Sequence, residues 1–543
     1  MTRLSSYPFA KSLLALSLSA VFSTATLAAT TSPLANDNFS VEVNGHIQST
    51  PHVTGNPLSI DNSWWGVDSM TQGNTIQIST SAQASDPATL DGDIFGGWSS
   101  KGTIANNQIL INVERGSLLL SNDIIGGFTN LSADATVENN LLDISGISLI
   151  SDVDVVRGKQ LRTLIAGGLA LSEEQSIGAS ALSVSNNHVM ISDSDLQKAV
   201  VTGGFIAGNQ FDVGKANKNI VTLDKVSTSE DEPSLIIMGG ASFGGLNNQA
   251  NNNEVTITDS TSAFVLAGLA GGIESQANGN KLLIENSTIR NEYSLNVAGL
   301  AGDIVGAHAL GIVSQANNNV VTLNNVSSAM VIGAVARDTG FYGEDESLGF
   351  AQANDNQFLW SNEDDFGSFD LNTLIIAGAI SSSGNAEVLR NTAEIIGLKT
   401  TEMGNSGIRT YGQERYGYVR KISFSALSDE GDAVLSENSL KIESSEIWDE
   451  MTAGVASGNN VVMSDNDFEV VNSQIEELGG YVALAYDNAK VIGNSIVANQ
   501  LTANSFVGLN VASRSSEISG NKIFINSSKI AGLIGIMVES GFF

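Results

Sequence analysis

The residue types best suited to binding chemistry gather in one short segment, TYGQERYGYVRK, at residues 410–421. The candidate ligand-binding residues there are Tyr411, Arg415, Tyr416, Tyr418 and Arg420. Tyr and Arg often dominate binding interfaces, and the whole chain has only 25 Lys and Arg residues. We expect this segment to contact a ligand; the plainer alternative is an ordinary surface loop.

Catalytic constellations are not recognisable. The four His residues have no Ser, Asp or metal-ligand pattern around them, and no GxSxG, HExxH or phosphate-binding loop occurs. Adjacent acids occur at Asp364–Asp365 and Glu476–Glu477, without a basic partner beside them, and paired carboxylates alone are weak evidence for glycoside chemistry. The sequence therefore predicts no catalytic residues and a protein that is not an enzyme. The His residues are His46, His52, His188 and His308.

Two acidic triplets are the best candidates for a cation, Asp91–Asp93 and Asp465–Asp467. Neither fits the EF-hand loop or the glycine–aspartate repeats that bind calcium. Calcium stays a minor alternative, and we predict neither a metal site nor a cofactor.

These segments stand out against a repeat that fills most of the chain. An Asn followed by alternating apolar residues recurs about every 34 residues, a period typical of stacked repeat architectures. The copies begin at Asn74, Asn107, Asn140, Asn187, Asn219, Asn253, Asn280, Asn319, Asn356, Asn438, Asn460, Asn494 and Asn521.

Glycine pairs recur between the Asn copies, as in IIGG at 124–127, IAGG at 165–168 and IMGG at 237–240. A third element, rich in Ser, Thr and Asp, follows each Asn strand. Asn tolerates the left-handed backbone of a sharp bend, and Gly fits where a side chain would collide. We expect Asn and Gly pairs to mark corners, with short strands between them.

A five-residue strand buries too little to be stable alone, but stacked equivalent strands would form continuous columns of Val and Ile. The sequence thus predicts an all-β chain, a right-handed parallel β-helix of stacked coils, with handedness from the usual crossover rule. A β-sandwich lacks such self-similarity, and propeller blades have longer periods and aromatic signatures. Aromatics make up only 6% of this chain.

The composition of the chain argues against one class of binding partner. The formal net charge of −33 argues against nucleic acid, which needs a basic face. The chain has 543 residues and no Cys. Disulfides therefore cannot stabilise it. No later segment is apolar for long enough to span a membrane as a helix.

The chain begins like an export signal: basic residues, a short apolar core at 13–22 and small residues at 26–29. We predict a signal peptide at 1–29, an N-terminal cap at 30–70 containing Trp64 and Trp65, and a β-helix at 71–543. Insertions are expected near 339–370, which is acidic and aromatic, and near 401–421.

The cycle of glycine pair, NNxVxI strand and Ser/Thr corner resembles the passenger domains of bacterial autotransporters, over roughly residues 70–540. The resemblance implies a pectin-lyase-like β-helix, Gram-negative surface display or secretion with passage through the periplasm, an outer-membrane translocator as partner, and adhesin-like, virulence-related roles. The translocating barrel that closes such proteins is not evident in the last 250 residues. Two-partner secreted exoproteins are a second, fainter resemblance.

Two functions follow from this sequence. The first is an exported or surface-displayed scaffold that binds host glycans or surface proteins. The second is a polysaccharide-degrading lyase or hydrolase on the same fold, which a groove of clustered acids and cations would favour.

Overall fold

The computed structural model describes most of the chain from residue 38 onward. The described ranges are 38–43, 46–48, 58–60, 63–65, 72–80, 87–91, 93–99, 102–120, 123–131, 134–149, 153–154, 159–160, 163–172, 180–208, 212–228, 235–243, 245–289, 303–311, 313–338, 349–363, 366–371, 373–381, 384–401 and 421–539. Within these ranges the regular elements are strands throughout. No helix among them is long and apolar enough to cross a bilayer.

The chain divides into two compact units. The first comprises Met1–Gly272 with Ser287–Ala301, and the second comprises Ile273–Asn286 with Gly302–Phe543. Each unit is built from coils that turn through the same sequence of strands.

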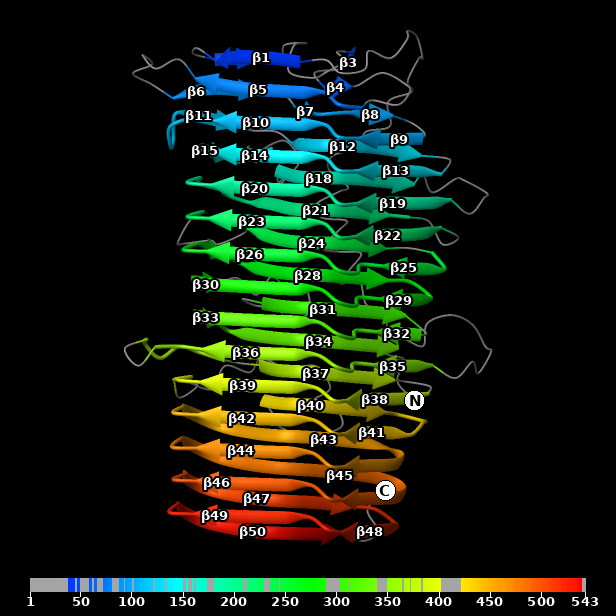
Figure 1. Cartoon of the computed structure of the whole chain (residues 1–543), viewed down its shortest axis with the longest axis vertical. Coiled ribbons are helices and arrows are strands. Elements are labelled where there is room, and N and C mark those ends of the chain that lie inside the picture. Colours follow the sequence, from blue (N-terminus) through cyan, green and yellow to red (C-terminus); the bar gives the residue numbers. More distant parts are fainter. Residues whose placement is uncertain are drawn as a thin grey trace. The chain divides into compact units, whose positions relative to one another are not determined.

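The strand that follows each repeated Asn forms the first row of each unit, and its members pair in parallel (Figure 1). In the first unit this Asn row is β1 (Asn38–Val43), β5 (Thr75–Thr80), β10 (Gln108–Asn112), β14 (Leu141–Ser145), β20 (His188–Ser192), β23 (Ile220–Asp224) and β26 (Glu254–Thr258). In the second it is β30 (Lys281–Ile289), β33 (Val320–Ser328), β36 (Gln357–Ser361), β39 (Thr392–Ile396), β42 (Ser439–Glu443), β44 (Asp467–Val471), β46 (Ser495–Asn499) and β49 (Lys522–Asn526).

The glycine-pair segments form a second parallel row, the Gly row. Its members in the first unit are β7 (Ile94–Phe95) with β8 (Trp98–Ser99), β12 (Ile124–Leu131), β18 (Thr163–Ser172), β21 (Ala199–Ala207), β24 (Ile236–Phe243) and β28 (Phe264–Gly271). In the second unit they are β31 (Asp303–Gly311), β34 (Met330–Asp338), β37 (Thr373–Ser381), β40 (Lys421–Ser428), β43 (Glu446–Ser464), β45 (Gln474–Ile492), β47 (Thr502–Ala512) and β50 (Lys529–Glu539).

A third row returns the chain to the next Asn. It consists of β9 (Gly102–Ala105), β13 (Ala135–Glu138), β19 (Ala181–Ser185), β22 (Val213–Asn217) and β25 (Asn247–Gln249) in the first unit. In the second it consists of β29 (Glu274–Gln276), β32 (Val313–Gln315), β35 (Phe350–Gln352), β38 (Asn385–Leu389), β41 (Ala433–Ser436) and β48 (Ser515–Ser519), while β43 and β45 are long enough to serve both rows.

The remaining strands belong to the first unit. Four short ones pair in parallel near its start: β2 (His46–Gln48), β6 (Ala88–Asp91), β11 (Leu118–Leu120) and β15 (Ile147–Leu149). Two antiparallel hairpins are β3 (Leu58–Ile60) with β4 (Ser63–Trp65), and β16 (Val153–Asp154) with β17 (Lys159–Gln160). A two-residue strand, β27 (Thr261–Ser262), pairs with residues 288–289.

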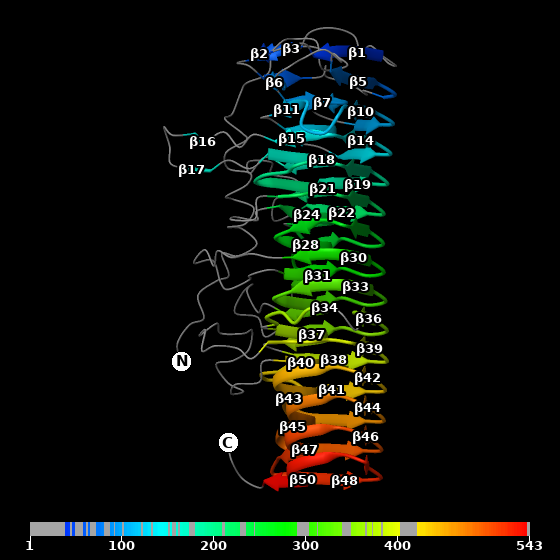
Figure 2. The same cartoon turned by 90° about the vertical axis from the view of Figure 1, so that its left-hand side faces the viewer.

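Within each unit, Figures 1 and 2 show the strands of one row lying directly above one another. The in-register partners are one repeat apart, as in Val221↔Val255 of the first unit and Leu440↔Phe468 of the second. The predicted all-β class and the stacked parallel β-helix are confirmed. The right-handed winding stays a prediction.

The hydrophobic core lies inside the coils. Asn-row strands show alternating burial, so that Val221 and Leu223 are fully buried while Thr222 between them faces outward. Equivalent residues stack from coil to coil, and this registration explains the period-two pattern of the sequence.

Residues with left-handed backbone form sharp corners at the ends of the Asn-row strands, before most of them and after several. In several coils these residues lie seven apart, as in Asn186 and Asp193, or Asn252 and Asp259, with φ between 46° and 57°. The first is the residue before the repeated Asn, and the repeated Asn itself is not left-handed. The expectation that the repeated Asn adopts the bend was therefore wrong by one residue.

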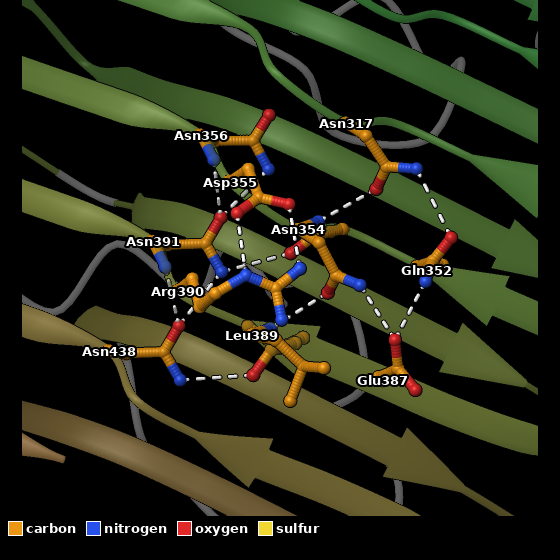
Figure 3. A network of polar contacts seen from close by, with 12 residues as sticks. Asn317, Gln352, Asn354, Asp355, Asn356, Glu387, Leu389, Arg390, Asn391 and Asn438 are labelled. Carbon is orange, nitrogen blue, oxygen red and sulfur yellow. Dashed lines mark hydrogen bonds and ion pairs between the residues drawn. The ribbon is translucent and has the colours of Figure 1, made fainter. Parts of the chain in front are cut away.

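The repeated Asn residues instead form a buried ladder inside each unit. Each side-chain oxygen accepts hydrogen bonds from the backbone N–H and the Nδ2 of the previous Asn, as in Asn107 to Asn140 at 3.1 and 2.9 Å. The first unit's ladder is Asn74, Asn107, Asn140, Asn187, Asn219 and Asn253. The second unit's is Asn280, Asn319, Asn356, Asn391, Asn438, Asn466, Asn494 and Asn521, part of which Figure 3 shows.

The glycine pairs lie inside Gly-row strands, not at corners, which corrects the sequence interpretation. A Cβ on Gly203 would come within 2.8 Å of the Cβ of Asn219 and 2.6 Å of the Gly239 carbonyl oxygen. A Cβ on Gly204 would meet the amide of Asn219 at 2.5 Å. The pair is glycine because the ladder amide fills the space where two side chains would stand.

One predicted copy does not belong to the ladder. Asn460 is partly exposed in β43 and bonds to Asp432 and Asn488, and the ladder position of that coil is Asn466. The sequence pattern also missed Asn391. In the predicted insertion range, residues 350–352 and 357–361 form regular strands β35 and β36. Strand β1, inside the predicted cap, pairs in register with β5. The predicted signal peptide lies outside the described residues.

Candidate functional site

The five predicted ligand-binding residues, Tyr411, Arg415, Tyr416, Tyr418 and Arg420, lie outside the described residues. The structure does describe the residues on either side of their segment, Thr401 and Lys421. The site is therefore built from the surroundings of these two residues, all within the second unit.

The two interruptions singled out in the sequence meet at one corner. The backbone N–H of Thr401 donates to the Phe369 carbonyl at 3.0 Å, and the Phe369 N–H donates to the Lys399 carbonyl at 3.2 Å. The Thr401 hydroxyl donates to the Asp370 carboxylate. We call residues 366–371, 399–401 and Trp448 the joint corner; its first part leaves β36 in Figure 1.

Aromatic rings hold the first part of the joint corner in place. Trp360 is fully buried, and Phe369 stacks on it with ring centroids 5.7 Å apart. Phe366 meets Phe369 edge-on at 6.3 Å. Both Phe residues are partly exposed. Aromatic faces held this way supply contact area with little loss of conformational entropy on binding.

The next coil contributes Trp448. Its backbone N–H donates to the Thr400 hydroxyl at 2.9 Å, and its indole N–H donates to Glu446 at 3.1 Å. The Thr400 N–H donates to the Glu446 carbonyl at 2.9 Å. The indole ring is partly exposed, so the joint corner presents an oriented indole beside a carboxylate.

A pair of carboxylates lies on the coil of Trp448 and on the coil that follows it. Glu450 of β43 pairs in register with Glu477 of β45, just after an irregularity in the strand. Burial, and then the charge of Glu477, raise the pKa of Glu450 above its ordinary value. The neighbouring residue Met451 pairs with Lys421, where the predicted binding segment ends. A carboxyl group whose pKa is raised by burial and by a neighbouring acid could act as a proton donor.

Elsewhere in the described residues, cations join coils through acids. Arg390 makes a two-pronged contact with Asp355 at 2.7 and 2.8 Å, drawn in Figure 3. Lys441 bonds Glu394 at 3.0 Å, and the carboxylates around it raise the pKa of its ammonium. In the first unit Arg115 binds Asp195, two coils further along the chain, at 2.6 Å. These pairs are partly exposed and contribute little stability each.

Figure 3 also shows amide and carboxylate side chains joined at the third row. Gln352 and Asn354 both donate to Glu387, at 2.7 and 2.6 Å, and Asn317 donates to Gln352 at 3.2 Å. This network satisfies polar groups between coils and leaves no cluster with a nucleophile and a base.

The acidic triplets and His188, which the sequence analysis considered as candidate site residues, lie within the repeating framework of the coils. In the second acidic triplet, Asp465 has left-handed backbone and Asn466 belongs to the ladder. Asp93 of the first triplet accepts a hydrogen bond from the Asp123 backbone N–H at 3.1 Å. His188 lies in β20, where burial lowers its pKa. Within the described ranges, no group of three acidic or His side chains could hold a metal ion.

Neither a protein-family model, a curated protein nor a solved structure matches this chain significantly. Function must therefore be inferred from the chain's own residues.

Proposed function

We propose that this chain is an exported or surface-displayed β-helical scaffold, similar to an autotransporter passenger, with adhesin-type binding to host glycans or surface proteins. Binding centres on the joint corner and the adjoining segment at 402–420. A cleaved signal at 1–29, a Gram-negative cell surface and an outer-membrane translocator belong to the same proposal.

The observation that supports this proposal most directly is the backbone hydrogen bond between Thr401 and Phe369. It joins, in one corner of the second unit, the two segments that break the repeat. Long segments on a rigid framework often carry function. The partly exposed rings of Phe366, Phe369 and Trp448, beside the carboxylates of Glu446 and Asp370, can stack on a sugar ring and accept its hydroxyl protons.

The test is a binding screen of residues 30–543 against glycan arrays and host-cell surfaces. Deletion of residues 410–420, which leaves Lys421 of β40 in place, and Trp448→Ala should each abolish or weaken binding about tenfold or more, as loss of an interface hot spot does. A matched control is Tyr486→Ala, which removes an aromatic ring that is 43% exposed outside the joint corner.

Circular dichroism must show the same strand content in every variant. Binding that survives the deletion and Trp448→Ala unchanged would refute the assignment of the joint corner. Export is tested separately by fractionating Gram-negative cells that express the whole chain, with N-terminal sequencing of the released protein. We expect cleavage near Ala29.

A second candidate function rests on the Glu450–Glu477 pair. The pKa of Glu450 is raised, which suits the general acid of a polysaccharide lyase or hydrolase. Incubation with neutral glycans and uronate polymers tests this directly. Release of reducing ends or unsaturated products that Glu450→Gln abolishes would favour the enzyme over the adhesin.

A further inference from the structure

The aromatic rings of the joint corner are spaced along the stack of coils. Phe369 pairs with Thr400 of the next coil. Lys399, beside Thr400, pairs with Glu446 of the coil after that, so Trp448 lies two coils beyond Phe369. At about 4.8 Å per strand, the two ring positions are about 10 Å apart along the stack. This distance is longer than a single sugar ring.

The joint corner lies between other coils of the second unit. The coil of β34 precedes it, and the coils of β45 and β47 follow it. The partial exposure of Phe366, Phe369 and Trp448 is therefore found in the middle of a stack. Between the rings, the Thr401 hydroxyl contacts the Asp370 carboxylate and supplies polar atoms to a ligand that bridges them.

Carboxylates outnumber cations among the described residues of these coils. The acids are Glu363, Asp370, Glu446, Glu450, Glu476 and Glu477. Lys399 offsets one of these charges, because it pairs in register with Glu446. The charge of Glu477 contributes, after burial, to the raised pKa of Glu450. An anionic sugar would add a further negative charge to this surface, on a chain whose net charge is already −33.

We propose that the joint corner binds a linear, uncharged glycan chain about three sugars long, which lies across the strands with one sugar on Phe366 or Phe369 and another on Trp448. The inference rests on the proposed function, because it specifies the ligand of the same site. Sugar faces pack against the aromatic rings, and hydroxyl groups of the sugars donate to the carboxylates. An uncharged chain makes both contacts without placing an anion beside those carboxylates.

The segment at 410–420 favours the opposite ligand charge. Arg415 and Arg420 lie in it, and guanidinium groups pair well with the carboxylate or sulfate of an acidic sugar. The experiment must therefore compare neutral and acidic glycans, with and without this segment.

A glycan array that carries each neutral chain beside its sialylated and sulfated counterparts tests the charge. We expect residues 30–543 to bind the neutral chain about tenfold or more tightly than either counterpart. Binding of the neutral chain should change little between 50 and 300 mM NaCl, because no ion pair with the ligand is screened. A preference for the acidic counterparts that deletion of residues 410–420 removes would overturn the proposal.

Titration calorimetry with one to four sugars of the preferred neutral chain tests the span. We expect the affinity to rise about tenfold or more from one sugar to three and then to level off. Phe366→Ala and Trp448→Ala should each remove this gain, while the control Tyr486→Ala should keep it. Equal affinity for one sugar and for three would overturn the proposal.

Failure of this inference differs from failure of the proposed function. Host cells that bind the chain through the joint corner, with no glycan bound on the array, would mean a protein partner. This result overturns the inference and leaves the adhesin role in place. A chain that binds neither cells nor glycans would refute both.

Discussion

At the scale of single residues, two neighbouring Asn residues before an Asn-row strand have different structural roles. The first takes the left-handed backbone of the corner, as Asn186 and Asn252 do. The second points inward and bonds to backbone groups of the interior, as Asn187 donates to the Val137 carbonyl at 3.2 Å. A buried polar group is tolerated only when such partners exist.

Removing one rung tests this account. Asn391 accepts from the N–H and Nδ2 of Asn356, both at 2.9 Å, and donates to Ala353 and Asn438 at 2.9 and 2.8 Å. Asn391→Ala would leave these groups buried and unpaired, so we expect a loss of about 3–5 kcal/mol in the free energy of unfolding. Urea unfolding measures it, with the exposed Asn488→Ala as control, which should cost under about 1 kcal/mol.

A pair of acids in the first unit makes stability depend on pH. The Asp123 N–H donates to Asp93 at 3.1 Å, and Asp123 accepts from the Leu164 N–H at 2.7 Å. Burial, and then the charge of Asp93, raise the pKa of Asp123 from 3.8 to about 8. The folded state therefore retains a proton that the unfolded chain loses.

Stability should consequently fall as pH rises from about 4 to about 8, by up to about 1.4 kcal/mol per pH unit, and level off above. Asp123→Asn keeps the shape and the hydrogen bond from Leu164 without the charge. We expect it to flatten the pH profile and to stabilise most at pH 8. Thermal unfolding from pH 4 to pH 9 measures this, and an unchanged slope in Asp123→Asn would show that other groups cause it.

At the scale of elements, the glycine pairs of the Gly row and the side chains of the Asn ladder occupy complementary space. Gly203 and Gly204 leave the space that Asn219 occupies, and Gly167 and Gly168 do the same for Asn187. The glycine pairs thus belong to the interior of a strand, although the same residue type is common at turns.

Filling that space should be costly. Gly203→Ala would place a methyl group 2.6 Å from the Gly239 carbonyl oxygen and 2.8 Å from the Asn219 Cβ, neither of which can move freely. We expect a loss of about 2–4 kcal/mol, as for an overpacked core. Gly367→Ala, where a Cβ would meet nothing within 4 Å, serves as control in the same thermal unfolding measurement.

The stacked coils and most of the ladder could be predicted from the sequence, because it shows an Asn followed by alternating Val, Ile and Leu in most repeats. It missed Asn391, whose strand TAEII has Ala at its first inward position, and it chose Asn460, which precedes a regular alternation. In the structure, Asn391 and Asn466 each follow a left-handed residue, Arg390 or Asp465, that has a second left-handed residue seven positions later.

The joint corner could not be predicted in the same way. Its parts, Phe369, Thr401 and Trp448, lie in three successive coils of unequal length. Ladder spacings of 35 and 47 residues there depend on how much chain each coil inserts. Only the register of the coils brings these residues together.

At the scale of the whole molecule, each unit keeps its ladder although coil length varies. Successive rungs lie 32–47 residues apart in the first unit and 27–47 in the second. The ladder hydrogen bonds are therefore kept across coils of different length. Stability then depends on contacts between neighbouring coils, as in other repeat proteins.

The net charge of −33 should act against this stacking through self-repulsion. Salt screens such repulsion, with a Debye length of about 10 Å at 0.1 M. We expect the melting temperature of residues 30–543 to rise between 10 and 300 mM NaCl at pH 7. A melting temperature that falls with salt would mean that the ion pairs outweigh the repulsion.

The central claim is that equivalent strands lie one coil apart in register, and spin-label distances test it most directly. The row Gln77, Leu110, Asp143, Met190, Thr222, Thr256 is paired step by step within the first unit. At about 4.8 Å per step, pulsed electron resonance should give about 19 Å between labels at Gln77 and Thr222, and about 24 Å for Gln77 and Thr256. Distances that do not increase by one strand spacing per coil, or broad distributions for both pairs, would contradict the stacked β-helix.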